Sequence, residues 1–140
     1  MKGIYLTQEI KPTYTTFEQS KLLKEKGFKS KSRYYDGSGK LVEPPDIPEN
    51  DYRHTNNEMQ RFRWEAPEQH VVVEWLRVNH GIWVYVKRCC EIRNNEAFDK
   101  FQPIIEFIPQ IKFDITDLPT FDSPQEAYSA AFDYVLNNLI

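Results

Sequence analysis

Apolar residues recur at helical spacing in three stretches of the chain, which predicts three helices. The first helix has an apolar stripe across residues 17–23. We expect it to begin with a capping box of Thr15 and Glu18 and to end at Gly27, because glycine suits the left-handed C-terminus of a helix. Phe28 would then fold back onto the stripe.

The second helix and the strand after it follow from residues 67–86. Pro67 suits the first helical position, and Gly81 is expected to end the helix. The β-branched and aromatic run 82–86 then predicts a strand, and its partner is expected within 102–108. The two prolines that flank this partner, Pro103 and Pro109, are typical of abrupt strand ends or of an edge position.

The third helix has the clearest start. Ser123 can cap it, Pro124 suits its first turn and Glu126 can complete a capping box. Earlier in the chain, residues 33–35 and 41–42 flank a glycine-rich turn and predict a hairpin. Phe62 and Trp64 alternate with arginines, which is compatible with a short strand.

Together these elements predict an α+β domain in which about three helices pack on a small antiparallel sheet made of hairpins. The length of 140 residues suits one domain, residues 1–140. Residues 43–60 are polar and rich in proline, so we expect a long polar loop there.

Composition and charge narrow the classes of function. The net charge is −3, which argues against a protein whose main partner is a polyanion. The charge is uneven, however: residues 1–40 hold nine basic and four acidic side chains, whereas 113–140 hold five acidic and no basic ones. No run approaches the roughly 20 apolar residues of a membrane span, so no membrane partner is expected.

The two cysteines, Cys89 and Cys90, are adjacent. Neighbours in a strand point to opposite faces, so a disulfide between them is not expected. We interpret both as free thiols that behave as buried, small apolar residues. With no visible signal peptide, they predict a cytoplasmic protein.

No recognisable catalytic, phosphate-binding or redox motif is present, so an enzyme is the least supported class and no cofactor is expected. His70 and Glu74 share one face of the second helix. A metal-dependent enzyme around them is a weak alternative, because a metal site needs at least one further ligand. A solvated pair explains these two residues more simply.

Nucleic-acid binding is a second alternative. It rests on a basic segment, 21–35, whose cations could contact phosphates and whose aromatic rings could stack on bases. The candidate residues are Lys24, Lys29, Lys31, Arg33, Tyr34 and Tyr35. Lysines of this kind are also what any solvated helix carries.

Protein binding is the favoured function. If residues 82, 84 and 86 face the helices, then Trp83, Tyr85 and Lys87 lie on the opposite face of the strand. Trp and Tyr dominate binding hot spots, so this face is a candidate site for an unknown protein partner. The alternative is that a helix covers this face too. A homodimer is also conceivable, through a strand edge or through the aromatic face.

Three patches of the chain carry a family resemblance. They are Thr15-Thr16-Phe17-Glu18-Gln19-Ser20 with Gly27; Ala66-Pro67, Trp75-Leu76-Arg77 and His80-Gly81-Ile82; and Phe121-Asp122-Ser123-Pro124 with the closing Leu139-Ile140. On these patches the chain resembles a set of uncharacterised small proteins of Bacteroidetes and of their phages and mobile elements. The resemblance implies a small bacterial or phage protein, and it supplies no reaction, cofactor or site residue.

Overall fold

A computed structural model describes residues 9–29, 33–42, 63–108, 114–115 and 118–140. It confirms the predicted α+β class and the order of helix, hairpin, helix, hairpin, helix. The elements are α1 (Phe17–Glu25), β1 (Arg33–Tyr35), β2 (Leu41–Val42), β3 (Trp64–Ala66), α4 (Gln69–His80), β4 (Ile82–Arg93), β5 (Glu96–Phe107), β6 (Asp114–Ile115) and α5 (Pro124–Asn138). The predicted loop 43–60 lies outside the described residues.

The start of α1 differs from the predicted one by a residue. Thr16, not Thr15, caps the helix: its hydroxyl accepts from the backbone N–H of Gln19, and the Gln19 side chain accepts from the N–H of Thr16. The prediction of a capping box formed by Thr15 and Glu18 is therefore wrong. Thr15 is instead buried, with its hydroxyl 2.8 Å from that of Ser20. The predicted end is confirmed, because Gly27 has a φ of 89°.

The helix α4 begins two residues later than predicted. The carbonyl of Pro67 accepts from the N–H of Thr15 at 3.0 Å, which holds Pro67 against the segment before α1 rather than in the helix. Glu68 is the N-cap and Gln69 the first helical residue. The C-terminal prediction is confirmed, since Gly81 adopts the left-handed conformation with a φ of 64°. For α5, Ser123 caps the helix as predicted and accepts from the backbone N–H of Glu126, but the Glu126 side chain does not complete the predicted capping box.

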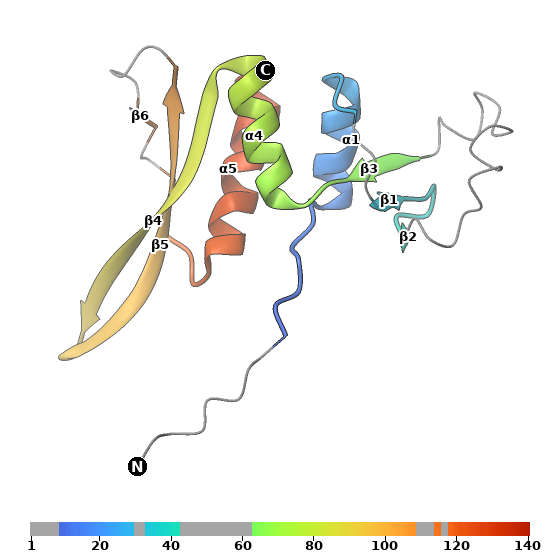
Figure 1. Cartoon of the computed structure of the whole chain (residues 1–140). Coiled ribbons are helices and arrows are strands. Elements are labelled where there is room, and N and C mark those ends of the chain that lie inside the picture. Colours follow the sequence, from blue (N-terminus) through green and yellow to red (C-terminus); the bar gives the residue numbers. More distant parts are fainter. Residues whose placement is uncertain (1–8, 30–32, 43–62, 109–113, 116–117) are drawn as a thin grey trace, which may run out of the picture.

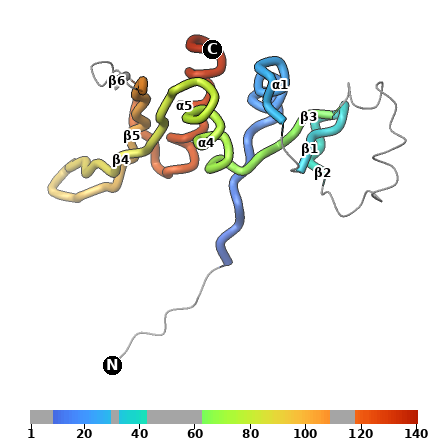
Figure 2. The backbone as a smooth tube through the Cα atoms, turned by 45° about the horizontal axis from the view of Figure 1, so that its top comes forward, coloured from blue at the N-terminus to red at the C-terminus, as the bar shows by residue number. Residues whose placement is uncertain are grey.

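The strands are divided between two antiparallel sheets, a division that the sequence does not indicate. Three short strands form one sheet in the order β2-β1-β3, and the other has the order β4-β5-β6. Figure 1 shows the helices between the two sheets, with the long hairpin of β4 and β5 on one side and the small sheet on the other. The tube view in Figure 2 shows the same arrangement.

The hydrophobic core lies where the helices meet the base of the long hairpin. Its buried members come from α1, α4, α5, β4 and β5 and from Phe28, which folds back as predicted; they are Leu23, Phe28, Val72, Leu76, Ile82, Val84, Ile105, Ala131, Phe132, Val135 and Leu136. A buried polar residue, Gln19, joins α1 to α5 through hydrogen bonds to Ser129 and Asp133. Because Ile82, Val84 and Ile105 belong to this core, packed side chains hold the base of the hairpin against the helices.

Candidate functional site

The long hairpin is more extensive than its apolar pattern predicts. Its strands have twelve residues each and pair in continuous register from Ile82 opposite Phe107 to Arg93 opposite Glu96. Two asparagines, Asn94 and Asn95, form the turn with φ values of 50° and 65°. Such a two-residue turn with both φ angles positive matches the twist of the strands that it joins. The distal half of the hairpin projects beyond the helices (Figure 1).

Pro103 lies inside this ladder rather than at its start. It is the partner of Val86 in the register of β4 and β5. The N–H of Ile108 donates to the carbonyl of Gly81 at 2.7 Å, so alternation makes Val86 and Pro103 a pair that exchanges no hydrogen bonds. A proline fits there, because it needs no N–H toward β4.

The three predicted partner-binding residues lie in one row on the hairpin. Their neighbours Ile82 and Val84 are buried against the helices, so the row lies on the opposite face. Trp83 is 37% exposed and Lys87 is exposed. Tyr85 is half-buried, and its hydroxyl donates to a carboxylate oxygen of Glu106 at 2.9 Å. Trp83 and Lys87 are thus accessible, whereas Ile104, the partner of Tyr85 on the same face, is buried.

Ile108 extends this face, and the sequence interpretation missed it. Residue 108 lies opposite Gly81, so its side chain shares a face with Trp83 and is 49% exposed. The signal was present in the alternation, since Glu106 and Ile108 are two residues apart. We define the aromatic face as Trp83, Tyr85, Lys87 and Ile108.

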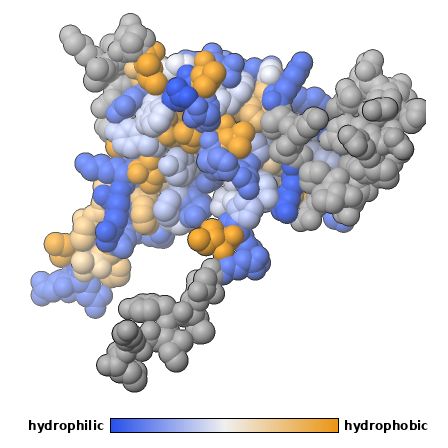
Figure 3. All heavy atoms as spheres, in the orientation of Figure 1, coloured by the Kyte–Doolittle hydropathy of each residue, from blue (hydrophilic) through white to orange (hydrophobic). Residues whose placement is uncertain are grey.

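The distal half of the hairpin is polar with isolated apolar side chains. Ile92 and Phe98 are 74% and 42% exposed. Figure 3 shows apolar and polar side chains next to each other along this projecting part. Cys89 is half-buried and Cys90 is exposed, so the prediction that both are buried is wrong. The reason is that the core ends near Val86, before the strand does.

Two basic side chains of the nucleic-acid alternative, Lys24 and Arg33, contact other parts of the chain. Lys29 is exposed, and Lys31 lies outside the described residues. Lys24 donates to the carbonyl of Arg63 at 2.9 Å, and partial burial lowers the pKa of its ammonium group. The guanidinium of Arg33 lies 4.8 Å from the ring centroid of Tyr14. Lys24 and Arg33 are therefore partly engaged within the chain, and Lys29 is the exposed cation among the described residues of this set.

The two tyrosines of that alternative are used in packing. Tyr34 is buried, and the guanidinium of Arg63 lies 3.8 Å from its ring centroid. Tyr35 packs against Phe17 with ring centroids 5.5 Å apart. Its hydroxyl donates to the carbonyl of Thr15 at 2.6 Å, and burial raises its pKa. Neither ring is presented as an open surface on which a base could stack.

The predicted pair of His70 and Glu74 is replaced by two other pairs. His70 has its Nδ1 3.4 Å from a carboxylate oxygen of Glu68, and Glu74 pairs with Arg77. The hydrogen bond from Arg77 lowers the pKa of the Glu74 carboxyl group. Both residues line an open hollow of about 400 Å³ beside Trp75.

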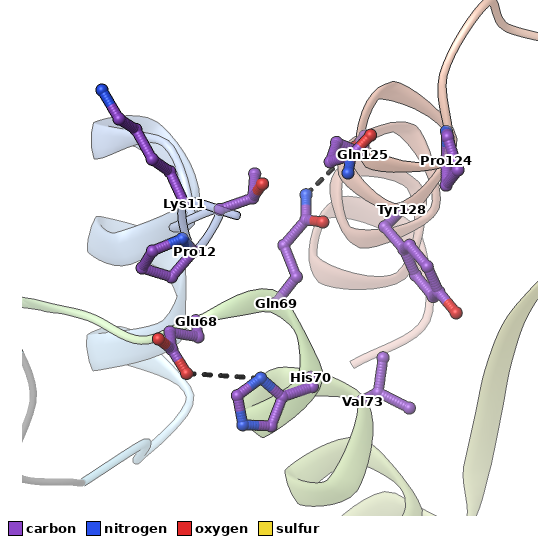
Figure 4. A pocket seen from close by; sticks show the side chains of 10 residues that line it. Lys11, Pro12, Glu68, Gln69, His70, Val73, Pro124, Gln125 and Tyr128 are labelled. Atoms are coloured by element: carbon purple, nitrogen blue, oxygen red, sulfur yellow. Dashed lines mark hydrogen bonds and ion pairs between the residues drawn. The ribbon is translucent and has the colours of Figure 1, made fainter. Parts of the chain in front are cut away.

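A second hollow, of about 350 Å³, includes His70 but not Glu74. It lies between the segment before α1, the start of α4 and the start of α5, where the side chain of Gln69 donates to the carbonyl of Gln125 at 3.0 Å (Figure 4). Within the described ranges, no three His, Cys, Asp or Glu side chains are close enough to hold a metal ion. The surroundings of His70 thus provide a carboxylate partner without a metal-binding cluster.

Comparisons of the chain with protein-family models, with curated proteins and with solved structures give no match. In the part of the chain that the structure describes, none of the helices combines the length and the apolar character needed to span a membrane.

Proposed function

We propose that the chain is a small, non-enzymatic accessory protein of a bacterial or phage-infected cytoplasm, and that it binds another protein through the aromatic face. The observation that carries this proposal is the 37% exposure of Trp83 beside Ile108, which is 49% exposed, on a strand whose other side is packed in the core. Large aromatic side chains held on a rigid surface are typical anchors of protein interfaces.

The surroundings of Trp83 support an interface of this kind. Tyr85 is held in place by its hydrogen bond to Glu106, so little side-chain entropy remains to be lost when a partner binds. Lys87 is exposed at the end of the row, where a charge can select a partner without being desolvated. The face therefore combines large apolar side chains with the carboxylate of Glu106 opposite Trp83 and the charge of Lys87 at its end, and protein interfaces usually contain both apolar and polar groups.

Affinity capture with a matched pair of variants tests the proposal. Trp83→Ser removes the anchor, whereas Val78→Ser changes a residue of α4 that is 65% exposed and lies outside the aromatic face. We expect wild type and Val78→Ser to retain the same protein from host lysate and Trp83→Ser to retain about thirtyfold less, the effect of a hot-spot residue worth about 2 kcal/mol. Quantitative mass spectrometry measures the amounts.

Equal retention by Trp83→Ser and wild type would overturn the proposal. Titration with short DNA and RNA at two salt concentrations separates it from the nucleic-acid alternative, because contacts to phosphate weaken as salt rises. Salt-dependent binding that is lost in a Lys24→Ala, Lys29→Ala variant and kept in Trp83→Ser would favour that alternative.

A further inference from the structure

The strand β4 is at the edge of its sheet, because the strand order is β4-β5-β6. The N–H of Ile108 donates to the carbonyl of Gly81, so by alternation the odd-numbered residues of β4 bond to β5. The N–H and C=O groups of residues 84, 86, 88, 90 and 92 then point away from β5. We name this row the open edge. Among the described residues, no backbone hydrogen bond joins it to another segment.

The distal part of the open edge is accessible to another strand. It belongs to the half of the hairpin that projects beyond the helices in both views (Figures 1 and 2). Ile92 on this part is 74% exposed. A long unpaired edge with exposed apolar side chains is a ready template for pairing with another chain.

We propose that two copies of the chain pair antiparallel through the open edge, about a two-fold axis that passes through Cys89. The two sheets then become one. This proposal does not rest on the proposed function, because it is argued from the open edge and the charges along it; Lys87 is the one residue that it shares with the aromatic face.

The geometry of strand pairing leaves few possible registers. In an antiparallel pair, opposed residues share a face, and their N–H and C=O groups either both point toward the partner strand or both point away from it. Opposed residues of β4 must therefore both be even-numbered or both odd-numbered, so a two-fold axis passes through a residue rather than between two. An axis through Arg88 or Glu91 places two like charges opposite each other, which is destabilising. An axis through Cys90 places Lys87 opposite Arg93, again two like charges.

An axis through Ile92 would pair Glu91 with Arg93, but it would leave only residues 91–93 of β4 paired. The axis through Cys89 pairs residues 85–93 and makes the charges of this region complementary. It places Lys87 opposite Glu91 of the second copy, and the symmetry makes this ion pair twice. It also places Val86 opposite Ile92 of the second copy, so the most exposed apolar side chain of β4 is covered by an apolar one. In the described part of a single copy, the ammonium group of Lys87 has no ion pair, whereas Glu91 already accepts from the guanidinium of Arg93 at 2.8 Å and would share its carboxylate between the two cations.

The pattern selects a second copy rather than an unrelated strand. Charged residues on an edge normally discourage pairing, and a uniformly basic edge would repel its own copy. Here the cation and the carboxylate lie two residues on either side of Cys89, so the edge is complementary to itself. In the resulting dimer, both aromatic faces lie on the same side of the joined sheet, because an axis normal to the sheet keeps each face on its own side.

Cysteine cross-linking tests the register directly. In the proposed dimer the two Cys89 residues form a non-hydrogen-bonded pair with Cα atoms about 4.5 Å apart, within the range of about 4.4–6.8 Å that a disulfide bridges. Copper–phenanthroline removes one electron from each thiol and the two protons pass to solvent. We expect Cys90→Ser to cross-link into a dimer and Cys89→Ser to remain monomeric on a non-reducing gel.

Substitutions that exchange the charges of Lys87 and Glu91 test the same register independently of cysteine cross-linking. Sedimentation of Lys87→Glu and of Glu91→Lys should show a dimer dissociation constant raised about tenfold or more, because two attractive pairs become repulsive. The double variant should return to within about threefold of wild type, since the pairs are restored with the charges exchanged. Circular dichroism of each variant confirms that the fold is kept.

Three results would overturn the proposal. They are a wild-type chain that sediments as a monomer at every concentration, cross-linking that requires Cys90 rather than Cys89, or a double variant that dimerises no better than the single ones. Capture of a partner by the aromatic face would be unaffected by any of them, so this proposal and the proposed function can fail separately.

Discussion

The buried amide of Gln19 provides the sharpest test of the packing between α1 and α5. The side chain is 1% exposed, and its Nε2 reaches the carbonyl of Ser129 at 2.9 Å, the hydroxyl of Ser129 at 2.8 Å and Oδ1 of Asp133 at 3.0 Å. Gln19→Leu keeps about the size of the side chain and removes these bonds, together with the bond from the N–H of Thr16 to Oε1 of Gln19 in the capping box. The amide group has two hydrogens for these three acceptors, so it makes about one neutral bond, which contributes about 1 kcal/mol, and one bond to a carboxylate, which contributes about 1.5–3 kcal/mol.

The expected net loss is smaller than this sum. Asp133 is exposed, so water replaces part of what its carboxylate loses. We therefore expect Gln19→Leu to lower the free energy of unfolding by about 2 kcal/mol. Urea unfolding followed by circular dichroism measures it, and an unchanged m-value shows that the same transition is compared.

Gln125→Leu is the matched control, because this glutamine has an exposed side chain on α5. It should stay within about 0.5 kcal/mol of wild type. If Gln19→Leu also stays within that margin, the hydrogen bonds of Gln19 do not contribute to stability, and the reasoning about the contact between α1 and α5 is refuted.

Two further predictions concern turns. Gly81→Ala should destabilise the chain more than Gly27→Ala in urea unfolding: both glycines have positive φ, but an added Cβ would meet a backbone oxygen at 3.0 Å at residue 81 and nothing within 4 Å at residue 27. Equal losses would contradict this. Hydrogen bonds from Ser38 and Lys40 hold the pKa of the Asp36 carboxyl group below its ordinary value of 3.8. Because folding lowers this pKa, the ionised Asp36 carboxylate stabilises the hairpin at pH values above 3.8. This stabilisation is lost as the pH falls through the lowered pKa. The amide resonance of Ser38 should therefore titrate with a midpoint below 3.8, and a midpoint at or above it would contradict the assignment.

The fold could be predicted from the sequence where the signal is local. Ser123 ends up capping α5, and Gly27 and Gly81 end their helices, because caps and left-handed residues depend on a few neighbouring atoms. The predicted N-cap of α1 is one residue too early, because Thr15 and Thr16 are both suitable capping residues. The hydroxyl of Thr15 contacts that of Ser20 in the interior, and Thr16 therefore caps the helix.

The distal half of the hairpin could not be predicted from apolar pattern. Residues 87–100 are mostly polar, because this part of the hairpin lies beyond the core and needs no buried face. The available signal was the pair Asn94-Asn95, since asparagine tolerates the positive φ that a two-residue turn requires. The exposure of Cys90 follows from the same extension of the strands.

The aromatic face could be predicted in part. Alternation alone places Trp83, Tyr85 and Lys87 on one side of β4. Whether a helix covers that side depends on tertiary packing, and the structure leaves Trp83 partly exposed. The partner of Glu74, by contrast, was not predicted, because Arg77 and His70 lie at similar spacings from it along the helix.

The most direct measurement of the central claim is hydrogen exchange of the chain alone and in complex with its captured protein partner. The account predicts slower exchange in peptides that cover 82–87 and 104–108, because the partner would cover the aromatic face, with 21–35 unchanged. Slower exchange confined to 21–35, or none in 82–108, would contradict the claim that the chain binds a protein through this face.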